Sequence, residues 1–159
     1  MYTNILVPFD GSDSARRALS TAIELGTKNG QESVDITVLQ VAAMTDFDYS
    51  SFEVAARMAG LGSIDEKQVE SLAENYISAS KEHMQEQVSK YFESLPENID
   101  IKIVVKRGNP RDIICNYANE NDIDCIVMGR RGVSGIRAAL GSVSTAVLRG
   151  TDLPVLVVK

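Results

Sequence analysis

The feature that most constrains the fold of this chain is a regular alternation of short apolar runs with longer segments at helical spacing. The runs are rich in β-branched residues, which is typical of strands. They occupy Asn4–Pro8, Val34–Val41, Ile99–Lys106, Ile123–Met128 and Pro154–Val158. Strands that alternate with helices pair in parallel, and strands this apolar are covered on both faces. Residues 1–159 therefore predict a single doubly wound α/β domain with a five-stranded parallel sheet and helices on both faces.

Helical spacing fills most of the segments between these runs. The first helix begins near Ser12 or Asp13, either of which can cap it, and Gly26 and Gly30 mark its end. Further helices are predicted over 64–95, 111–120 and 142–149. One face of the longest helix carries Val69, Leu72, Tyr76, Ser80, Met84, Val88, Tyr91 and Leu95. Pro96 ends that helix, because proline cannot continue it.

Residues 42–62 have little periodicity apart from a short helical pattern at 52–58. Most connections in compact domains are short, and a longer one is usually functional or mobile. We therefore expect 42–62 to be a mobile insertion.

Composition and charge exclude several classes of protein. No apolar run reaches the ~20 residues of a membrane span, so we expect no membrane partner. The N-terminus has neither a basic start nor a small-residue cleavage site, and the expected location is the cytoplasm. The net charge of −6 argues against a nucleic-acid partner.

The charge is unevenly distributed along the chain. From Gly129 onward there are five basic residues and one acid, namely Arg130, Arg131, Arg137, Arg149 and Lys159 against Asp152. Positive charge on an acidic chain favours a small anionic ligand. Arginines exposed to solvent would give the same count.

The sequence also indicates what its cysteines and histidine do. Cys115 and Cys125 have apolar neighbours, which predicts two reduced, buried small hydrophobes. Together with the single histidine, His83, they cannot supply a four-ligand zinc site. His83 lies in a charged helical pattern and is predicted at the surface.

A glycine-bearing stretch follows the fourth predicted strand, from Gly129 to a helix start at Gly141–Ser142. Glycines let backbone N–H groups approach a phosphate, and a helix N-terminus adds free N–H groups and positive potential. The stretch lacks the Gly-Lys-Ser/Thr ending of a P-loop, and its glycine spacing is not that of a dinucleotide fingerprint. The other interpretation is a turn whose glycines only cap neighbouring elements.

Three other strand ends offer weaker candidates. Asp10, after the first strand, can accept a hydrogen bond from an adenine amino group or a ribose hydroxyl, although Asp10 or Ser12 can equally cap a helix. The backbone of Val41 and Ala42 can meet a base edge, and Gly108 can let a ribose approach. In α/β sheets, ligands bind beyond the carboxyl ends of the strands, where these residues lie.

Taken together, these segments resemble the universal stress protein family over nearly the whole chain. The matching segments are ILVPFDGSDSARRAL, GNPRDIICNYANENDIDCIVMG, GRRGVSGIRAALGSVSTAVL and PVLVVK. The resemblance implies a sheet ordered 3-2-1-4-5, a homodimer joined through 154–158, and, in the nucleotide-binding branch, bound ATP. Mg²⁺ can accompany the ATP, because it keeps most of its waters and needs few protein ligands.

The resemblance also implies a set of site residues. Phosphates and ribose would be contacted by Gly129, Gly132, Gly141, Ser142, Val143 and Ser144. The adenosine would be held by Pro8, Phe9, Asp10 and Val41, with Gly108 nearby. Met128 and Arg131 complete the candidate set, and Asp10 is a candidate ligand of Mg²⁺ carried by ATP.

In one respect the chain departs from the family pattern. Eight residues separate Gly132 from Gly141, where the family has nine. One residue less shortens an extended segment by roughly 3.3 Å. The loss either falls in the irregular part of the loop and leaves phosphate binding intact, or shifts Gly141 relative to Gly129 and weakens it.

Three functions remain open from the sequence. The first is an ATP-binding regulatory stress-response dimer with little or no hydrolysis, whose ligand orders 42–62 or the glycine loop. The second is a nucleotide-free interaction module that pairs through its last strand. The third is a weak nucleotide hydrolase or transferase. An enzyme is the least favoured, because the proposed site offers Asp10 and hydroxyls but no histidine and no paired carboxylates.

Overall fold

The computed structural model describes residues 2–28, 30, 33–43, 49–60, 62, 65–93, 95–132 and 140–159. Its strands are β1 (Asn4–Pro8), β2 (Val34–Ala43), β3 (Ile99–Gly108), β4 (Cys125–Gly129) and β5 (Val155–Val158). They form one parallel sheet in the order β3-β2-β1-β4-β5. The predicted fold and strand order are confirmed.

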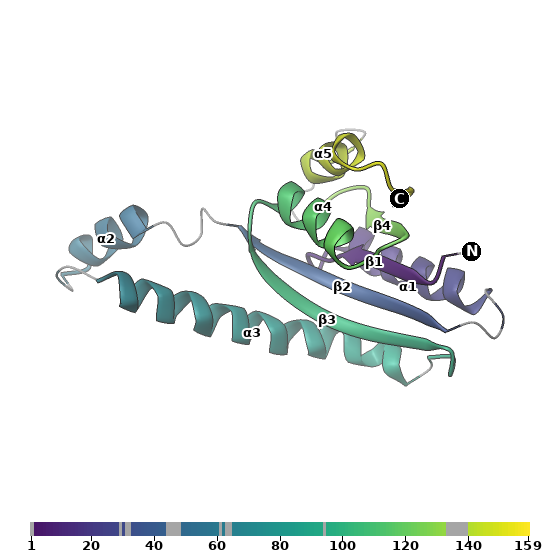
Figure 1. Cartoon of the computed structure of the whole chain (residues 1–159). Helices are drawn as coiled ribbons and strands as arrows, with labels where there is room; N and C mark the ends of the chain where they lie inside the picture. The colour runs from purple at the N-terminus through teal and green to yellow at the C-terminus, as the bar shows by residue number, and fades with distance from the viewer. Residues whose placement is uncertain are drawn as a thin grey trace.

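The helices are α1 (Asp13–Thr27), α2 (Tyr49–Met58), α3 (Glu66–Phe92), α4 (Pro110–Glu120) and α5 (Ser142–Gly150). Residues of α1 and α3 pack on one face of the sheet, and residues of α4 and α5 pack on the other (Figure 1). Each face has its own buried cluster, because neighbouring residues of a strand point to opposite sides. In β1, for example, Ile5 and Val7 belong to the first cluster and Leu6 to the second.

Local signals explain where the helices begin. Ser12 caps α1 by accepting a hydrogen bond from the Ala15 N–H. Asn109 caps α4, with Pro110 in the first turn. Asp65 and Gln68 form a capping box at α3, so this helix begins at Glu66 rather than at the predicted Ile64.

Several predicted boundaries were wrong by a few residues. β2 continues to Ala43 and β3 to Gly108, because the two strands pair with each other over ten positions. β4 begins at Cys125 rather than Ile123, and α3 ends at Phe92 rather than Leu95. Gly26 lies inside α1, where an added Cβ would lie 3.0 Å from Ile99 Cδ1. Its absent side chain makes room for β3, and the helix ends one residue later.

One face of β3 is less covered than predicted. Its side chains alternate, and Ile99 and Ile101 are buried under α3 while Asp100 and Lys102 are exposed. At the other end of the sheet, α3 continues past the strands, and α2 lies beside this overhanging part (Figure 1).

The predicted insertion at 42–62 lies partly outside the described residues, which omit 44–48 and 61. Within it, the short helix predicted at 52–58 is present as α2 and begins at Tyr49. Whether the insertion is mobile stays a prediction.

Both cysteines are free and buried, as predicted. Burial raises the pKa of the Cys125 thiol to about 11, and burial also raises that of Cys115. Both thiols therefore stay protonated at neutral pH and behave as small apolar groups. His83 is exposed on α3, also as predicted.

Candidate functional site

A cleft of ≈ 740 Å³ lies at the carboxyl ends of β1 and β4, bordered by the first turns of α4 and α5. We refer to it as the central cleft. The strand order reverses between β1 and β4, since β1 connects to β2 on one side of it and β4 to β5 on the other. Such a reversal is where ligands bind in open parallel sheets.

Twelve of the thirteen candidate residues line the central cleft. They are Pro8, Phe9, Asp10, Val41, Met128, Gly129, Arg131, Gly132, Gly141, Ser142, Val143 and Ser144. They come from four segments that are far apart in the sequence, and the sheet brings these segments to one edge. This convergence is a geometric finding, and binding itself stays a prediction.

Gly108 is the candidate that the structure does not bring to the cleft. It pairs with Ala43, two residues beyond Val41, which is the last residue of β2 that lines the cleft. Two residues of strand correspond to roughly 7 Å. Gly108 has φ +148°, and an added Cβ would lie 2.9 Å from Ile113 Cγ1. Its lack of a side chain leaves room for Ile113 at the turn into α4, and the approach of a ribose to Gly108 stays a prediction.

Five lining residues were not predicted, namely Ala15, Leu39, Gln40, Pro110 and Ile114. Because ligands were expected to bind after the end of each strand, Gly108 was the candidate residue after β3. The side chains that reach the cleft from this connection belong instead to the first turn of α4. The helical spacing of Pro110 and Ile114, four residues apart, was the available signal.

One wall of the central cleft is apolar. Leu39 is fully buried, and Phe9, Ile114 and Met128 are nearly so. Pro8 and Val41 lie beside them at the strand ends. A planar, uncharged ring fits such a wall, because it gains from removal of its faces from water.

The opposite wall is the N-terminus of α5. Gly141 is the N-cap residue and provides no side-chain hydrogen bond to the helix. The N–H groups of Ser142, Val143 and Ser144 lie in the first turn, where an α-helix offers no backbone acceptor. Together with the helix dipole, these N–H groups suit an anion.

The hydroxyl of Ser144 is already used within the protein. Ser144 is buried, and its Oγ lies within hydrogen-bond distance of the Arg130 carbonyl (3.1 Å) and the Gly141 carbonyl (3.0 Å). It donates its proton to one of them, so Ser144 offers a ligand its backbone N–H rather than its hydroxyl. Ser142, two residues earlier in the same turn, is exposed at the cleft.

The two ends of the glycine loop are joined directly. The Gly141 N–H donates to the Arg130 carbonyl at 2.8 Å, and the Arg130 N–H donates to Val158 at 2.7 Å. On the other side, Ser12 and Ser14 both donate to the Arg131 carbonyl. The shorter spacing therefore does not separate Gly141 from the start of the loop. Residues 133–139 lie outside the described residues.

Among the described residues, the charged side chains that line the central cleft are those of Asp10 and Arg131. An oxygen of the Asp10 carboxylate, Oδ1, accepts a hydrogen bond from the Ser12 N–H at 3.0 Å, which orients the side chain at the rim. The other oxygen, Oδ2, lies 2.6 Å from the position of a Cβ at Gly132. The formal charges of Asp10 and Arg131 cancel, so the attraction for an anion comes mainly from backbone N–H groups.

Metal-binding clusters and membrane-spanning helices are both absent from the described part of the chain. Within it, no group of three or more histidine, cysteine, aspartate or glutamate side chains is placed to hold a metal ion. Nor does any helix in it combine the length and the apolar character that crossing a membrane requires.

Comparison with known proteins gives a consistent match. The pattern of the Universal stress protein family matches residues 1–159. The universal stress protein Sll1388 of Synechocystis is 31% identical over 167 residues, which cover 99% of this chain and 98% of that protein. The universal stress protein MJ0577 of Methanocaldococcus jannaschii is 28% identical over 160 residues, covering 100% and 96%.

Solved structures agree with the sequence match. The structure of MJ0577 superposes with a TM-score of 0.75 at 25% identity, covering 100% of this chain and 96% of that one. UspA of Lactobacillus plantarum has a TM-score of 0.72 at 26% identity, with coverages of 99% and 98%. Two more distant structures share the fold: a universal stress protein in complex with cAMP (21% identity, TM-score 0.54) and an Arabidopsis thaliana protein with AMP bound (17%, 0.56).

Proposed function

The chain belongs to the universal stress protein family, and from that premise we propose that it is an ATP-binding regulatory protein of the stress response. It acts as a cytoplasmic homodimer and hydrolyses ATP little or not at all. The observation that carries the proposal is the central cleft, which combines an apolar wall with the uncapped N-terminus of α5. Relatives with the same fold hold AMP or cAMP, which supports an adenine nucleotide.

In the proposed complex, the base lies against Pro8, Val41 and Met128. The phosphates lie on the first turn of α5, where the N–H groups of Ser142 and Val143 face the cleft wall. This arrangement places the uncharged part of the ligand on apolar surface and the charged part on hydrogen-bond donors. It uses the chemistry of the two walls and requires no large rearrangement of the sheet.

Little or no hydrolysis follows from the proposed side-chain roles. Asp10 is the carboxylate that lines the cleft, and no histidine lines it among the described residues. Asp10 would hold Mg²⁺ that is carried by the phosphates, since Mg²⁺ keeps most of its waters and uses few protein ligands. A lone carboxylate in this role orients the ligand without activating a nucleophile.

The proposed dimer forms at β5 rather than at the other edge of the sheet. The exposed residues of β3 include Asp100, Lys102 and Lys106, and such charges prevent strands from pairing edge to edge. β5 has the sequence Val-Leu-Val-Val and carries no charge. Its exposed apolar edge therefore suits pairing with a second copy.

The experiment that tests nucleotide binding uses Gly141→Val. Gly141 has φ −73° and ψ 162°, which valine tolerates, and an added Cβ would lie 3.3 Å from the Arg130 carbonyl. We expect a folded protein whose branched side chain at the start of α5 blocks the phosphates, so calorimetry should show at least a roughly hundredfold loss of ATP affinity.

Thr145→Val is the matched control, because it adds a valine one turn further along α5 and outside the cleft. It should bind ATP like the unchanged protein. Mass spectrometry of protein purified without added nucleotide gives an independent measure of bound ligand. Unchanged ATP affinity in Gly141→Val would refute the site. Nucleotide-free protein that remains a dimer and binds no ATP would favour the interaction module, and turnover that Asp10→Ala abolishes would favour an enzyme.

A further inference from the structure

The connection between β1 and α1, residues 9–12, has the central cleft on one side and α3 on the other. Asp10 lines the cleft. Phe9, its neighbour, is buried in the same cluster as Met84 and Val88 of α3. We call this connection the β1–α1 turn, and it is the part of the cleft wall that packs on the long helix.

Gln87 of α3 contacts the β1–α1 turn at Gly11. Gly11 has φ +77°, a conformation that glycine adopts readily and other residues rarely. A Cβ added there would lie 3.3 Å from Gln87 Oε1 and 3.6 Å from Gln87 Nε2, and its three nearest atoms would all belong to this amide. The space that the missing side chain leaves is therefore bordered by the end of Gln87.

The Gln87 amide is oriented by His83, one turn earlier on α3. The Nε2 atoms of the two side chains lie 2.6 Å apart. An amide nitrogen donates and cannot accept, so in this contact the ring nitrogen of His83 is the acceptor. The other atom of the amide, Oε1, is thereby directed toward Gly11.

Gln87 Oε1 is buried and has no hydrogen-bond partner in the described part of the chain. A buried oxygen without a donor destabilises a fold, and for this reason most buried polar atoms in proteins are paired. In the adjoining turn, the Ser12 N–H donates to Asp10 Oδ1 at 3.0 Å. An acceptor that lacks a donor thus lies against a turn whose N–H group is held by a carboxylate of the cleft.

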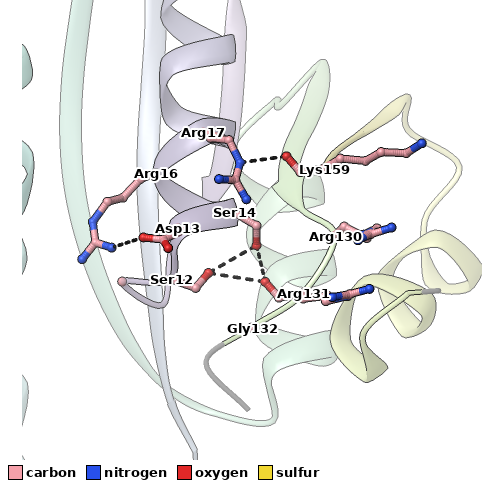
Figure 2. A pocket seen from close by; sticks show the side chains of 10 residues that line it. Ser12, Asp13, Ser14, Arg16, Arg17, Arg130, Arg131, Gly132 and Lys159 are labelled. Carbon is pink, nitrogen blue, oxygen red and sulfur yellow. Dashed lines mark hydrogen bonds and ion pairs between the residues drawn. The ribbon is translucent and has the colours of Figure 1, made fainter. Parts of the chain in front are cut away.

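The far end of the β1–α1 turn is fixed to β4. Ser12 and Ser14 both donate to the Arg131 carbonyl, in a pocket that borders the start of α1 (Figure 2). At the near end, Phe9 is held in the buried cluster under α3. A movement of the Asp10 carboxylate is therefore accommodated mainly at Gly11, whose backbone is the most permissive of the turn.

We propose that Gln87 is a positioning residue of the nucleotide site, and that its Oε1 accepts the hydrogen bond of the Ser12 N–H when the Asp10 carboxylate turns toward a bound nucleotide. This inference rests on the proposed function and gives α3 a role in it. The exchange keeps the N–H group paired and supplies the buried oxygen with a donor. Nucleotide binding and the contact between the turn and α3 then strengthen each other.

Calorimetry with ATP and Mg²⁺ on the full chain, combined with urea unfolding, tests the proposal through Gln87→Met. Methionine is an unbranched side chain of similar length that lacks the amide oxygen. We expect ATP binding to weaken roughly fivefold, which corresponds to the loss of one hydrogen bond. The free energy of unfolding should not fall, because the variant removes a buried oxygen that has no donor. A residue that only supported the fold would show the opposite combination.

Gln85→Met is the matched control. It makes the same substitution on the same helix, two residues earlier, at an exposed position outside the central cleft. Its ATP affinity and its stability should equal those of the unchanged protein. A loss of ATP affinity as large as that of Gln87→Met would assign the effect to α3 in general and overturn the role of Gln87.

A double-mutant cycle with Asp10→Ala tests whether Gln87 acts through Asp10. Without the carboxylate, the Ser12 N–H can pair with Gln87 Oε1 both before and after binding, so no exchange takes place. In the Asp10→Ala background, Gln87→Met should therefore change ATP affinity by less than about twofold. Equal losses in the two backgrounds would mean that Gln87 acts independently of Asp10, which contradicts the proposal.

Two further outcomes separate this inference from the proposed function. If the unchanged protein binds ATP and Gln87→Met binds it equally well, Gln87 is not a positioning residue although the proposed function stands. If the unchanged protein binds no ATP, the proposed function fails and this inference fails with it.

Discussion

At the scale of single residues, a glycine can serve a ligand or serve packing, and the sequence does not distinguish the two. Gly129, Gly132 and Gly141 all line the central cleft. An added Cβ at Gly129 would lie 2.8 Å from the Ser14 carbonyl carbon and 2.9 Å from the Ala15 nitrogen, which are backbone atoms of α1. Gly129 therefore lets α1 pack against β4, whatever it does for a phosphate.

This difference gives a paired prediction for Gly129→Ala and Gly132→Ala. The first methyl group meets fixed backbone, so we expect a loss of about 1–3 kcal/mol in the free energy of unfolding. The second meets Asp10 Oδ2, the end of an exposed side chain that can move aside. Its cost should stay below about 1 kcal/mol. Urea unfolding measures both.

Equal losses in the two variants would contradict the assignment of Gly129 to packing. ATP calorimetry on the same proteins adds a second readout. Gly132→Ala adds a methyl group to the lining of the central cleft and displaces the Asp10 carboxylate, so it should weaken ATP binding while the fold stays stable.

At the scale of elements, the strands were predictable and their lengths were not. β-branched runs and alternation with helices indicate five parallel strands, because both follow from local chemistry and from the handedness of the crossovers. The extension of β2 to Ala43 and of β3 to Gly108 depends on their pairing with each other. That pairing is a tertiary contact, and for this reason the predicted ends of the two strands were wrong.

The long helix shows the same limit. α3 spans 27 residues, roughly 40 Å, whereas β3 spans 10 residues, roughly 33 Å. The apolar stripe predicted on α3 includes Met84, which is 1% exposed over the sheet, and Leu72, which is 45% exposed beyond it. Periodicity identifies the apolar face of a helix but not how far the sheet beneath it extends.

Truncation of these two residues should therefore have unequal effects. Met84→Ala removes a side chain from the buried cluster between α3 and the sheet, and we expect it to lower the free energy of unfolding by about 2–5 kcal/mol. Leu72→Ala makes a similar truncation where the side chain is half exposed, and the loss should be below about 1 kcal/mol. Both variants introduce alanine into the same helix, so the change in helix propensity is similar in both. It therefore largely cancels when their free energies of unfolding, measured by heat or urea, are compared. Comparable losses would mean that the overhanging half of α3 is packed in solution.

At the scale of the whole molecule, the convergence of the candidate site was more predictable than the packing of α1 beside it. The cleft residues follow strand ends, and the rule for open parallel sheets brings those ends together whatever the details. Arg16 and Arg17 follow no such rule. Arg16 pairs with Asp13 on the side of Ser14 away from Arg130, whereas Arg17 Nε donates to the main-chain oxygen of Lys159 (Figure 2). The second contact forms because α1 packs beside the end of β4, where Ser14 donates to the Arg131 carbonyl. The uneven charge after Gly129 did not indicate this packing of α1.

The two edges of the sheet lead to the last prediction, which concerns assembly. Leu156 on β5 is 39% exposed, so lysine should be tolerated there in a single copy of the chain. Within the proposed dimer, the same lysine would bury a charge in an apolar edge, and we expect Leu156→Lys to yield a monomer of 17.3 kDa by light scattering.

Asp100→Lys is the control, because it places a lysine on the exposed face of the opposite edge strand, and it should remain a dimer. Circular dichroism checks that both variants are folded. The reverse result, a monomeric Asp100→Lys and a dimeric Leu156→Lys, would move the interface to β3, while dimers of both variants would place it away from the sheet edges.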